Sequence, residues 1–284
     1  MQRSWGWLFL LALAGVGCAH FEARNQFEQS FEQSGEGPLS RVEVDTSSGD
    51  VRIQGVPGAR FQVTGRISVY ASSPEKAREL AEQIAREPPV EVSGQVLSLG
   101  RKKLPGDGMF QGVSIDYVVV VPPEVAASID TSSGDVEVRG LQGPVKVDSS
   151  SGDVRLTQVG AAQVNSSSGE VVLEEVAGDI EVDSSSGDVQ VRGSPSARAR
   201  WDIDASSGDI TLAVAPDASF HFEAHTSSGE VKTEVPIRVR GTVDSDSLEG
   251  KVGEGVTEAE VKVHASSGDI RLRHHGASGA QASQ

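Results

Sequence analysis

The sequence of 284 residues is poor in several residue types, and each shortage narrows the range of possible proteins. There is one cysteine, Cys18, which would be left as a free thiol unless it is modified. Aromatic residues make up 5% of the chain while glycine reaches 32 residues, a balance typical of a thin, repetitive β core. The 25 basic residues are outnumbered by 41 acidic ones, and a net charge of −16 argues against nucleic acid or anionic lipid as a direct partner.

Motifs of common enzymes are also missing. The sequence has no Gly-x-Ser-x-Gly, no Walker loop and no His-Glu-x-x-His. His221 and His225 lie four residues apart without a cysteine or acid at zinc spacing, so we predict no metal site and no cofactor. Because a glycoside-cleaving enzyme needs only a few acids or bases that converge in one cleft, a polysaccharide-active β-helix enzyme stays open as an alternative function.

The only long apolar run is at the N-terminus. Residues 1–17 combine Arg3 with an apolar stretch too short for a spanning helix, which predicts a secretory signal. The following segment, Ala14-Gly15-Val16-Gly17-Cys18, resembles a bacterial lipobox, although Gly15 stands where leucine is usual. The resemblance implies that Cys18 carries lipid and becomes the mature N-terminus. No Asp follows Cys18, so we expect an outer-membrane lipoprotein that faces the periplasm or the cell surface.

A short repeat dominates the rest of the chain. A Ser-Ser-Gly-acid core recurs with its glycine at Gly49, Gly134, Gly152, Gly169, Gly187, Gly208, Gly229 and Gly268. A degenerate copy, Ser247-Leu248-Glu249-Gly250-Lys251, fills the one gap in the series. Most of the spacings lie close to 20 residues, a period that indicates a solenoid whose turns each contribute one structural unit.

The residues around each glycine alternate between apolar and polar. Val145 and Val147 precede Gly152, and Val154 and Leu156 follow it, which predicts two strands with one buried face on either side of a corner. The third residue before each glycine should also point inward, and it is always Ser, Thr or Ala. A large side chain would not fit inside a tight corner. The glycine should supply the positive φ that other residues resist.

These patterns predict an all-β fold, a single-chain parallel β-solenoid (β-helix) of about nine short turns with one α-helix inserted after the first turn. Ser73 and Pro74 can start the helix, and the proline pair at 88–89 stops it. The predicted segments are a tether with a capping strand (18–40), the solenoid (41–273), a helix (about 74–87), strands at Phe61–Tyr70, Val90–Leu99 and Val113–Val121, a basic loop (101–108) and a disordered tail (274–284).

Acidic residues recur on both sides of each corner, and both positions should face outward. Stacked carboxylates about 4.8 Å apart repel one another, and calcium between turns would relieve the repulsion. The calcium interpretation would involve Asp148, Asp153, Asp183, Asp188, Asp204 and Asp209. We favour the simpler interpretation that each aspartate accepts hydrogen bonds from nearby turn amides and serines.

Taken together, the exported N-terminus, the strand-helix-strand interval and the serial Ser-Ser-Gly-Asp-Val copies resemble the bacterial putative-adhesin family of β-solenoid domains. The resemblance covers roughly residues 26–273 and carries no catalytic residue set. It implies a structural or adhesive envelope protein, anchored to a membrane by its N-terminal lipid, that binds a surface glycan or protein. Besides the enzyme, a calcium-dependent or an ice- or mineral-binding repeat array remains an alternative.

Overall fold

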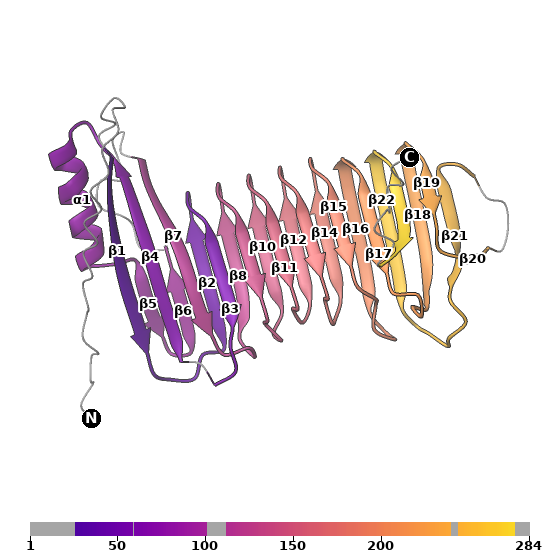
Figure 1. The fold of residues 1–284 in the computed structure, drawn as a ribbon, viewed down its shortest axis with the longest axis horizontal. Helices are drawn as coiled ribbons and strands as arrows, with labels where there is room; N and C mark the ends of the chain where they lie inside the picture. The colour runs from indigo at the N-terminus through magenta and orange to yellow at the C-terminus, as the bar shows by residue number, and fades with distance from the viewer. Residues whose placement is uncertain (1–25, 59, 101–111, 240–243, 276–284) are drawn as a thin grey trace, which may run out of the picture.

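The computed structural model describes residues 26–58, 60–100, 112–239 and 244–275. The signal segment, Cys18, the basic loop and most of the C-terminal tail lie outside the described residues. The described chain forms an elongated β-solenoid in which two large sheets face each other along the whole long axis (Figure 1). The predicted all-β solenoid with one helix is therefore confirmed.

Each sheet is named here by a letter, and its strands are given in spatial order. Sheet A contains β1 (Gln26–Gly35), β4 (Phe61–Tyr70), β7 (Gly112–Val121), β3 (Val51–Gly55), β9 (Val136–Arg139), β11 (Val154–Thr157), β13 (Val171–Glu174), β15 (Val189–Arg192), β17 (Ile210–Val214), β23 (Ile270–His274) and β19 (Val231–Thr233). Sheet B contains β20 (Ile237–Val239), β21 (Ser247–Val252), β18 (Phe220–Ser228), β22 (Glu260–Ser267), β16 (Arg200–Ser207), β14 (Ile180–Ser184), β12 (Ala162–Ser166), β10 (Val145–Ser149), β8 (Ala126–Thr131), β2 (Arg41–Thr46), β6 (Val96–Leu99) and β5 (Val90–Ser93).

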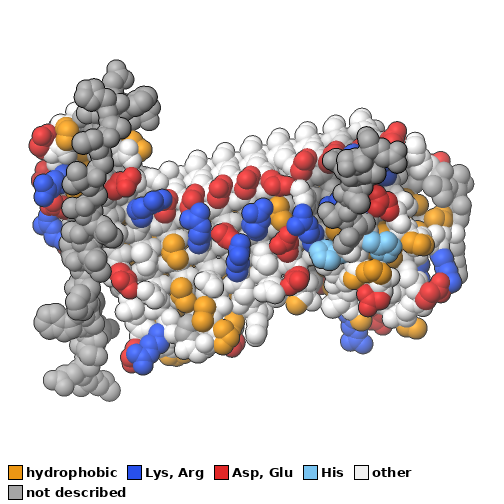
Figure 2. Space-filling model, in the orientation of Figure 1, with side chains coloured by type: hydrophobic (Ala, Val, Ile, Leu, Met, Phe, Trp, Pro, Cys, Tyr) orange, Lys and Arg blue, Asp and Glu red, His pale blue; other side chains and the backbone are white. Residues whose placement is uncertain are grey.

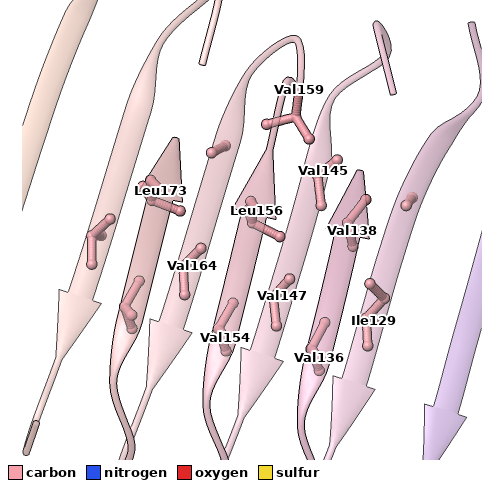
Figure 3. Packing of buried hydrophobic residues seen from close by; sticks show 14 of the residues in the cluster. Ile129, Val136, Val138, Val145, Val147, Val154, Leu156, Val159, Val164 and Leu173 are labelled. Carbon is pink, nitrogen blue, oxygen red and sulfur yellow. The ribbon is translucent and has the colours of Figure 1, made fainter. Parts of the chain in front are cut away.

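Each repeat supplies one strand to sheet B and the next to sheet A, with the Ser-Ser-Gly corner between them. Repeats stack in parallel and in register, so that Val147 lies beside Ile129 on one side and Val164 on the other. The apolar side chains of both sheets fill the space between them (Figure 3). The period-two alternation thus becomes a continuous core that no single repeat could close by itself.

The small residues that precede the corners are buried, as predicted, except Thr46 at the first corner, which is half-buried. Thr131, Ser149, Ser166, Ser184 and Thr226 are each at most 5% exposed. Thr131 Oγ1 donates to the carbonyl of Ser133 at 3.2 Å, which ties the corner to its own strand. The hydroxyls of Ser149 and Ser184 are buried and find no partner among the described residues.

The corner glycines have two reasons to be glycine. All eight have positive φ, from 113° to 159°. In addition, a Cβ on Gly187 would lie 2.1 Å from the carbonyl oxygen of Gly169 in the neighbouring turn. Sequence reasoning gave the first reason and missed the second, which exists only because consecutive corners stack glycine on glycine.

The degenerate copy is not a corner, so the described residues contain eight Ser-Ser-Gly corners, and the ninth layer of the stack comes from β6 and β7 beside β2 and β3. Residues 247–252 form β21, which runs antiparallel beside β18 without a bend into sheet A. Gly250 is absent from the positive-φ glycines, and its missing Cβ instead makes room for Ile237 of β20. The segment that matched the repeat is one arm of a β20–β21 hairpin that extends sheet B.

The last turns are not stacked in sequence order, contrary to the expected serial array. The turn of Gly268 lies between those of Gly208 and Gly229, because β22 pairs with β16 on one side and with β18 on the other. The β20–β21 hairpin closes the outer side of β18. Stacking in sequence order therefore ends at the turn of Gly208. The later turn of Gly268 inserts between it and the turn of Gly229.

The other end of the solenoid is capped by β1 and by α1 (Pro74–Arg86). Ser73 is the N-cap, and its side chain accepts a hydrogen bond from the Lys76 amide. The predicted strand at Val90–Leu99 is instead the hairpin β5–β6, which turns at Gly94 with φ of 60°. Within the described residues, no helix combines the length and the apolar character needed to cross a membrane.

Candidate functional site

The first acidic row follows the corner glycines and is called the corner ladder. In spatial order it contains Asp50, Asp135, Asp153, Glu170, Asp188, Asp209, Asp269 and Glu230. Figure 2 shows a row of acidic side chains along the solenoid with basic side chains beside it. The repeat places this row at the N-terminal ends of successive sheet A strands, where every turn adds one carboxylate.

Each aspartate of the corner ladder accepts a hydrogen bond from the backbone amide of the next member. The amide of Asp209 donates to Asp188 Oδ1 at 2.8 Å, and the amide of Asp269 donates to Asp209 Oδ1 at 2.9 Å. The first aspartate, Asp50, donates its own amide to Asp116 Oδ1 of β7 at 3.0 Å. The predicted role of the aspartates as amide acceptors is confirmed here, with the amide supplied by the adjacent turn.

The ladder is interrupted once, at Glu170. Its side chain is one methylene longer than aspartate, and among the described residues it accepts no bond from the Asp188 amide. Glu170 Oε1 instead accepts from Gln190 Nε2 at 2.5 Å. The turn of Gly169 therefore exchanges a bond to the backbone for a bond between side chains.

Hydrogen bonding favours the ionised form of two carboxylates of the corner ladder. The amide of Asp269, helped by the Arg271 guanidinium, lowers the pKa of Asp209. The amide of Glu230 in turn lowers the pKa of Asp269. The hydrogen bonds that connect adjacent turns thus also stabilise the ionised form of these two carboxylates.

The second row lies four residues before the corner glycines, on the outer face of sheet B, and is called the strand ladder. In spatial order it contains Asp45, Asp130, Asp148, Asn165, Asp183, Asp204, His264 and His225. Asp148 accepts from Asn165 at 2.6 Å, while Asp183 and Asp204 accept no hydrogen bond within the described part of the chain. The row ends in two stacked imidazoles, with the ring centroids of His225 and His264 5.5 Å apart.

In the strand ladder, Asp204 has surroundings that disfavour its charge, in contrast to Asp209 of the corner ladder. Partial burial raises the pKa of Asp204, and the nearby carboxylates of Asp202 and Asp183 raise it further. His264 acts in the opposite direction. Asp204 and Asp209, on the two sides of one corner, therefore have opposite electrostatic surroundings.

The six aspartates of the calcium interpretation fall into these two separate rows. Asp153, Asp188 and Asp209 belong to the corner ladder, where each accepts the amide of the next turn. Their counterparts four residues before the glycines belong to the strand ladder on the other sheet. Among the described residues, no three His, Cys, Asp or Glu side chains converge as a metal-binding group.

Several hollows open on the outer surface of the described residues. One of about 490 Å³ runs across the outer face of sheet B and is lined in part by the small residues Ala126, Pro144 and Ala161. Another, of about 350 Å³, lies where sheet A strands end, and it includes Glu174, Glu175 and Arg192 in its wall. Sequence reasoning did not single out these last residues. The sequence does mark this place. Six residues after the corner glycine, the flanking turns have Gly140 and Gly193, whereas these two turns have a glutamine at 158 and a glutamate at 175.

A model of the Toastrack DUF4097 family matches residues 125–273. No curated protein matches the chain. Among solved structures, the chain is similar to a "putative cell adhesion protein" from Clostridium sporogenes, at 11% identity and a TM-score of 0.40 over 88% of this chain and 100% of that one. It is also similar to a "putative adhesin" from Bacteroides fragilis, at 12% identity and a TM-score of 0.35 over 87% and 96% of the two chains. A "putative adhesin" from Parabacteroides distasonis is similar at 13% identity and a TM-score of 0.39 over 86% of this chain and 97% of that one.

Proposed function

Because this chain belongs to the Toastrack DUF4097 family of β-solenoid-like domains, we propose that it is an exported, lipid-anchored envelope protein whose solenoid is a rigid, non-catalytic binding platform. Its ligand is a glycan or protein of a surface. The domain supplies a stiff, repetitive face that positions this contact away from the anchor, in a structural or adhesive role.

The observation that carries this proposal is the way charged groups are distributed. Acidic side chains recur at equivalent positions in successive turns, and the aspartates of the corner ladder accept hydrogen bonds from amides of the adjacent turn. A catalytic site instead needs a few groups in distinct environments around one point. Carboxylates arranged as a ladder and committed to backbone donors suit a scaffold.

The anchor gives the platform a direction. Cys18 precedes the start of β1 at Gln26 by eight residues, a tether of at most about 28 Å when fully extended. β1 and α1 lie at one end of the long axis, and β20 and β21 lie at the other (Figure 1). A lipid on Cys18 would hold the β1 end near the bilayer and leave the turns near Gly229 and Gly268 projecting outward.

Membrane fractionation tests the anchor. We expect the full-length protein to partition with membranes and its N-terminal peptide to carry acyl mass, whereas Cys18→Ser should be released or left unprocessed. Equal membrane association of both proteins without acyl mass would contradict the lipid anchor.

The binding role is tested by screening the full-length protein, purified in mild detergent, against glycan and surface-protein arrays. Saturable binding to at least one ligand is expected. Turnover of a polysaccharide without stable binding would favour the enzyme and would contradict the platform.

A further inference from the structure

The turn of Gly169 departs from the repeat at several positions at once. Where the corner ladder is interrupted, Gln190 bridges Glu170 and Arg192, with Arg192 Nη2 donating to Gln190 Oε1 at 3.3 Å. Arg192 Nη1 also donates to Glu174 Oε1 at 2.6 Å. These bonds hold a half-buried guanidinium and carboxylate in fixed positions on sheet A.

The same region holds two side chains in an unfavourable backbone conformation. Gln158 and Glu175 both have φ of 55°, a region that residues other than glycine rarely adopt. Each lies six residues after its corner glycine, where Gly140 and Gly193 serve in the flanking turns. The amide Nε2 of Gln158 donates to Glu175 Oε2 at 2.9 Å, so the two side chains are held together at the surface.

A hollow lies beside these side chains at the second corner, the turn that leads from sheet A back to sheet B. The glycine spacing rises from 18 (169 to 187) to 21 (187 to 208), so the second corner lengthens by three residues after Gly193. At this step Gly193 and Ala215 contribute almost no side chain, and a space of about 350 Å³ remains. Its wall also includes Thr157 and His275.

The lining fits a ligand that is rich in hydroxyl groups. Carboxylates of Glu174 and Glu175 accept hydrogen bonds, while Arg192 and the Gln158 amide donate, and each hydroxyl of a sugar can do both. The volume is near the lower end of the range of about 300–1,000 Å³ that is usual for small-molecule sites. Two carboxylates against one guanidinium leave one net negative charge, which favours a ligand with an ammonium group.

We propose that this second-corner hollow binds one saccharide unit and prefers an amino sugar to an acidic one. The inference rests on the proposed binding role and names the ligand class for one place on the platform. Thr157, Glu174, Glu175 and Arg192 contact the sugar through polar atoms, and Gly193 and Ala215 provide the floor against which its C–H groups pack.

Isothermal titration of the full-length protein in mild detergent with glucosamine, glucose and glucuronic acid tests the site. We expect glucosamine to bind about tenfold tighter than glucuronic acid, because the ammonium meets net negative charge and the carboxylate meets repulsion. Glu175→Gly should weaken glucosamine about tenfold or more, through the loss of one charge-assisted hydrogen bond.

The choice of glycine separates binding from folding. Glycine adopts positive φ without strain, so Glu175→Gly should melt no lower than the natural protein, and its loss of binding would not reflect damage. Glu181→Gln is the matched control, since it removes one carboxylate from sheet B outside the hollow and should leave sugar affinity unchanged.

Three results would overturn the inference. The first is no binding of any of the three sugars up to about 50 mM, where a site with a Kd of about 1 mM would be saturated. The others are unchanged affinity in Glu175→Gly and an equal loss in Glu181→Gln. If the protein still binds a surface ligand in the array screen while the hollow fails, the platform function stands without this site. If the array screen is also blank, the platform function fails with it.

Discussion

The corner ladder and the strand ladder lie on opposite sides of the same corners, and their carboxylates have opposite surroundings. Asp209 and Asp204 are five residues apart in one turn. Asp209 accepts an amide of the next turn at 2.9 Å, and its pKa is lowered. Asp204 accepts no hydrogen bond from the described residues and lies beside other carboxylates, and its pKa is raised.

The contrast shows that repetition of a residue does not reveal its role. In the corner ladder the aspartate bonds one turn to the next, because its short side chain reaches the following amide. In the strand ladder the side chain stands on a flat sheet face whose amides are already committed to neighbouring strands. One acid stabilises the stack and the other gives the surface its charge.

The largest expected effect comes from breaking the corner that both ladders share. Gly187→Val should destabilise the protein by about 3 kcal/mol or more, since a β-branched residue would be forced to φ of 116° with its Cβ 2.1 Å from the Gly169 carbonyl. Urea unfolding measures the loss. Gly94→Ala is the control, because Gly94 also has positive φ but nothing within 4 Å of a Cβ, so only the conformational cost of about 1 kcal/mol should appear. Equal losses would show that contact between corners contributes nothing.

Removal of one acceptor from the corner ladder should have a smaller effect. Asp209→Ala should cost about 1–2 kcal/mol, because it removes the acceptor of the Asp269 amide and the partner of Arg271 at a partly exposed site. Asp209→Asn retains an acceptor oxygen and should lose less. If the asparagine variant were as unstable as the alanine variant, charge rather than the amide bond would be the source of stability.

The strand ladder should respond in the opposite direction. Because the folded-state pKa of Asp204 lies above its unfolded value, the ionised carboxylate destabilises the fold at neutral pH, and the penalty disappears as pH falls through the raised pKa. Asp204→Asn should therefore stabilise at pH 7, by less than about 1 kcal/mol after solvent screening, and show no advantage near pH 3. Asp209 should contribute stability above its unfolded pKa, and this contribution should be lost as pH falls through its lowered folded pKa. Melting temperatures at both pH values check this, and a less stable Asp204→Asn at pH 7 would contradict it.

The smallest effect is expected between the two ladders, at the buried hydroxyl of Ser184. Ser184 is 4% exposed, its Oγ lacks a partner among the described residues, and Ala205 takes the equivalent place in the next turn. Ser184→Ala should raise stability by about 0.5–1 kcal/mol in urea unfolding. Ser166→Ala is the control, because its hydroxyl donates to the Ser168 carbonyl at 3.4 Å and its removal should bring no gain. A gain of the same size in both variants would show that the unpaired hydroxyl of Ser184 is not the cause.

Local features of the fold were predictable because local residues determine them. Alternation of apolar and polar residues around each corner predicts the two strands. Ser73 is the N-cap of α1, and the helix begins at Pro74, as expected. Small residues at the inner corner position follow from the space available there. None of these features depends on which distant segment lies alongside.

Pairing between distant segments was not predictable in the same way. The copies at Gly229 and Gly268 match the motif equally well, and nothing within either copy says that the second inserts before the first. The degenerate copy at 247–251 matched only in spacing, and it lacks the serine pair that precedes a true corner glycine. Its role in a hairpin is decided by its partner β18.

The candidate sites divide along the same line. The prediction that turn amides satisfy the aspartates is correct for the corner ladder and wrong for the strand ladder, since only stacking determines which amides are free. The hollow near Glu174 and Arg192 depends on a change in the length of the second corner between adjacent turns. The sequence contains that change in spacing, but its consequence appears only when the turns are side by side.

Hydrogen exchange at the Asp209 amide tests most directly whether the corner ladder is structural and the strand ladder is not. Asp188→Ala and Asp183→Ala remove one carboxylate from each ladder within the same turn. We predict that Asp188→Ala accelerates exchange at Asp209 about tenfold, through loss of its 2.8 Å hydrogen bond, while Asp183→Ala leaves exchange at this amide unchanged. Equal exchange at Asp209 in the two variants would contradict the account.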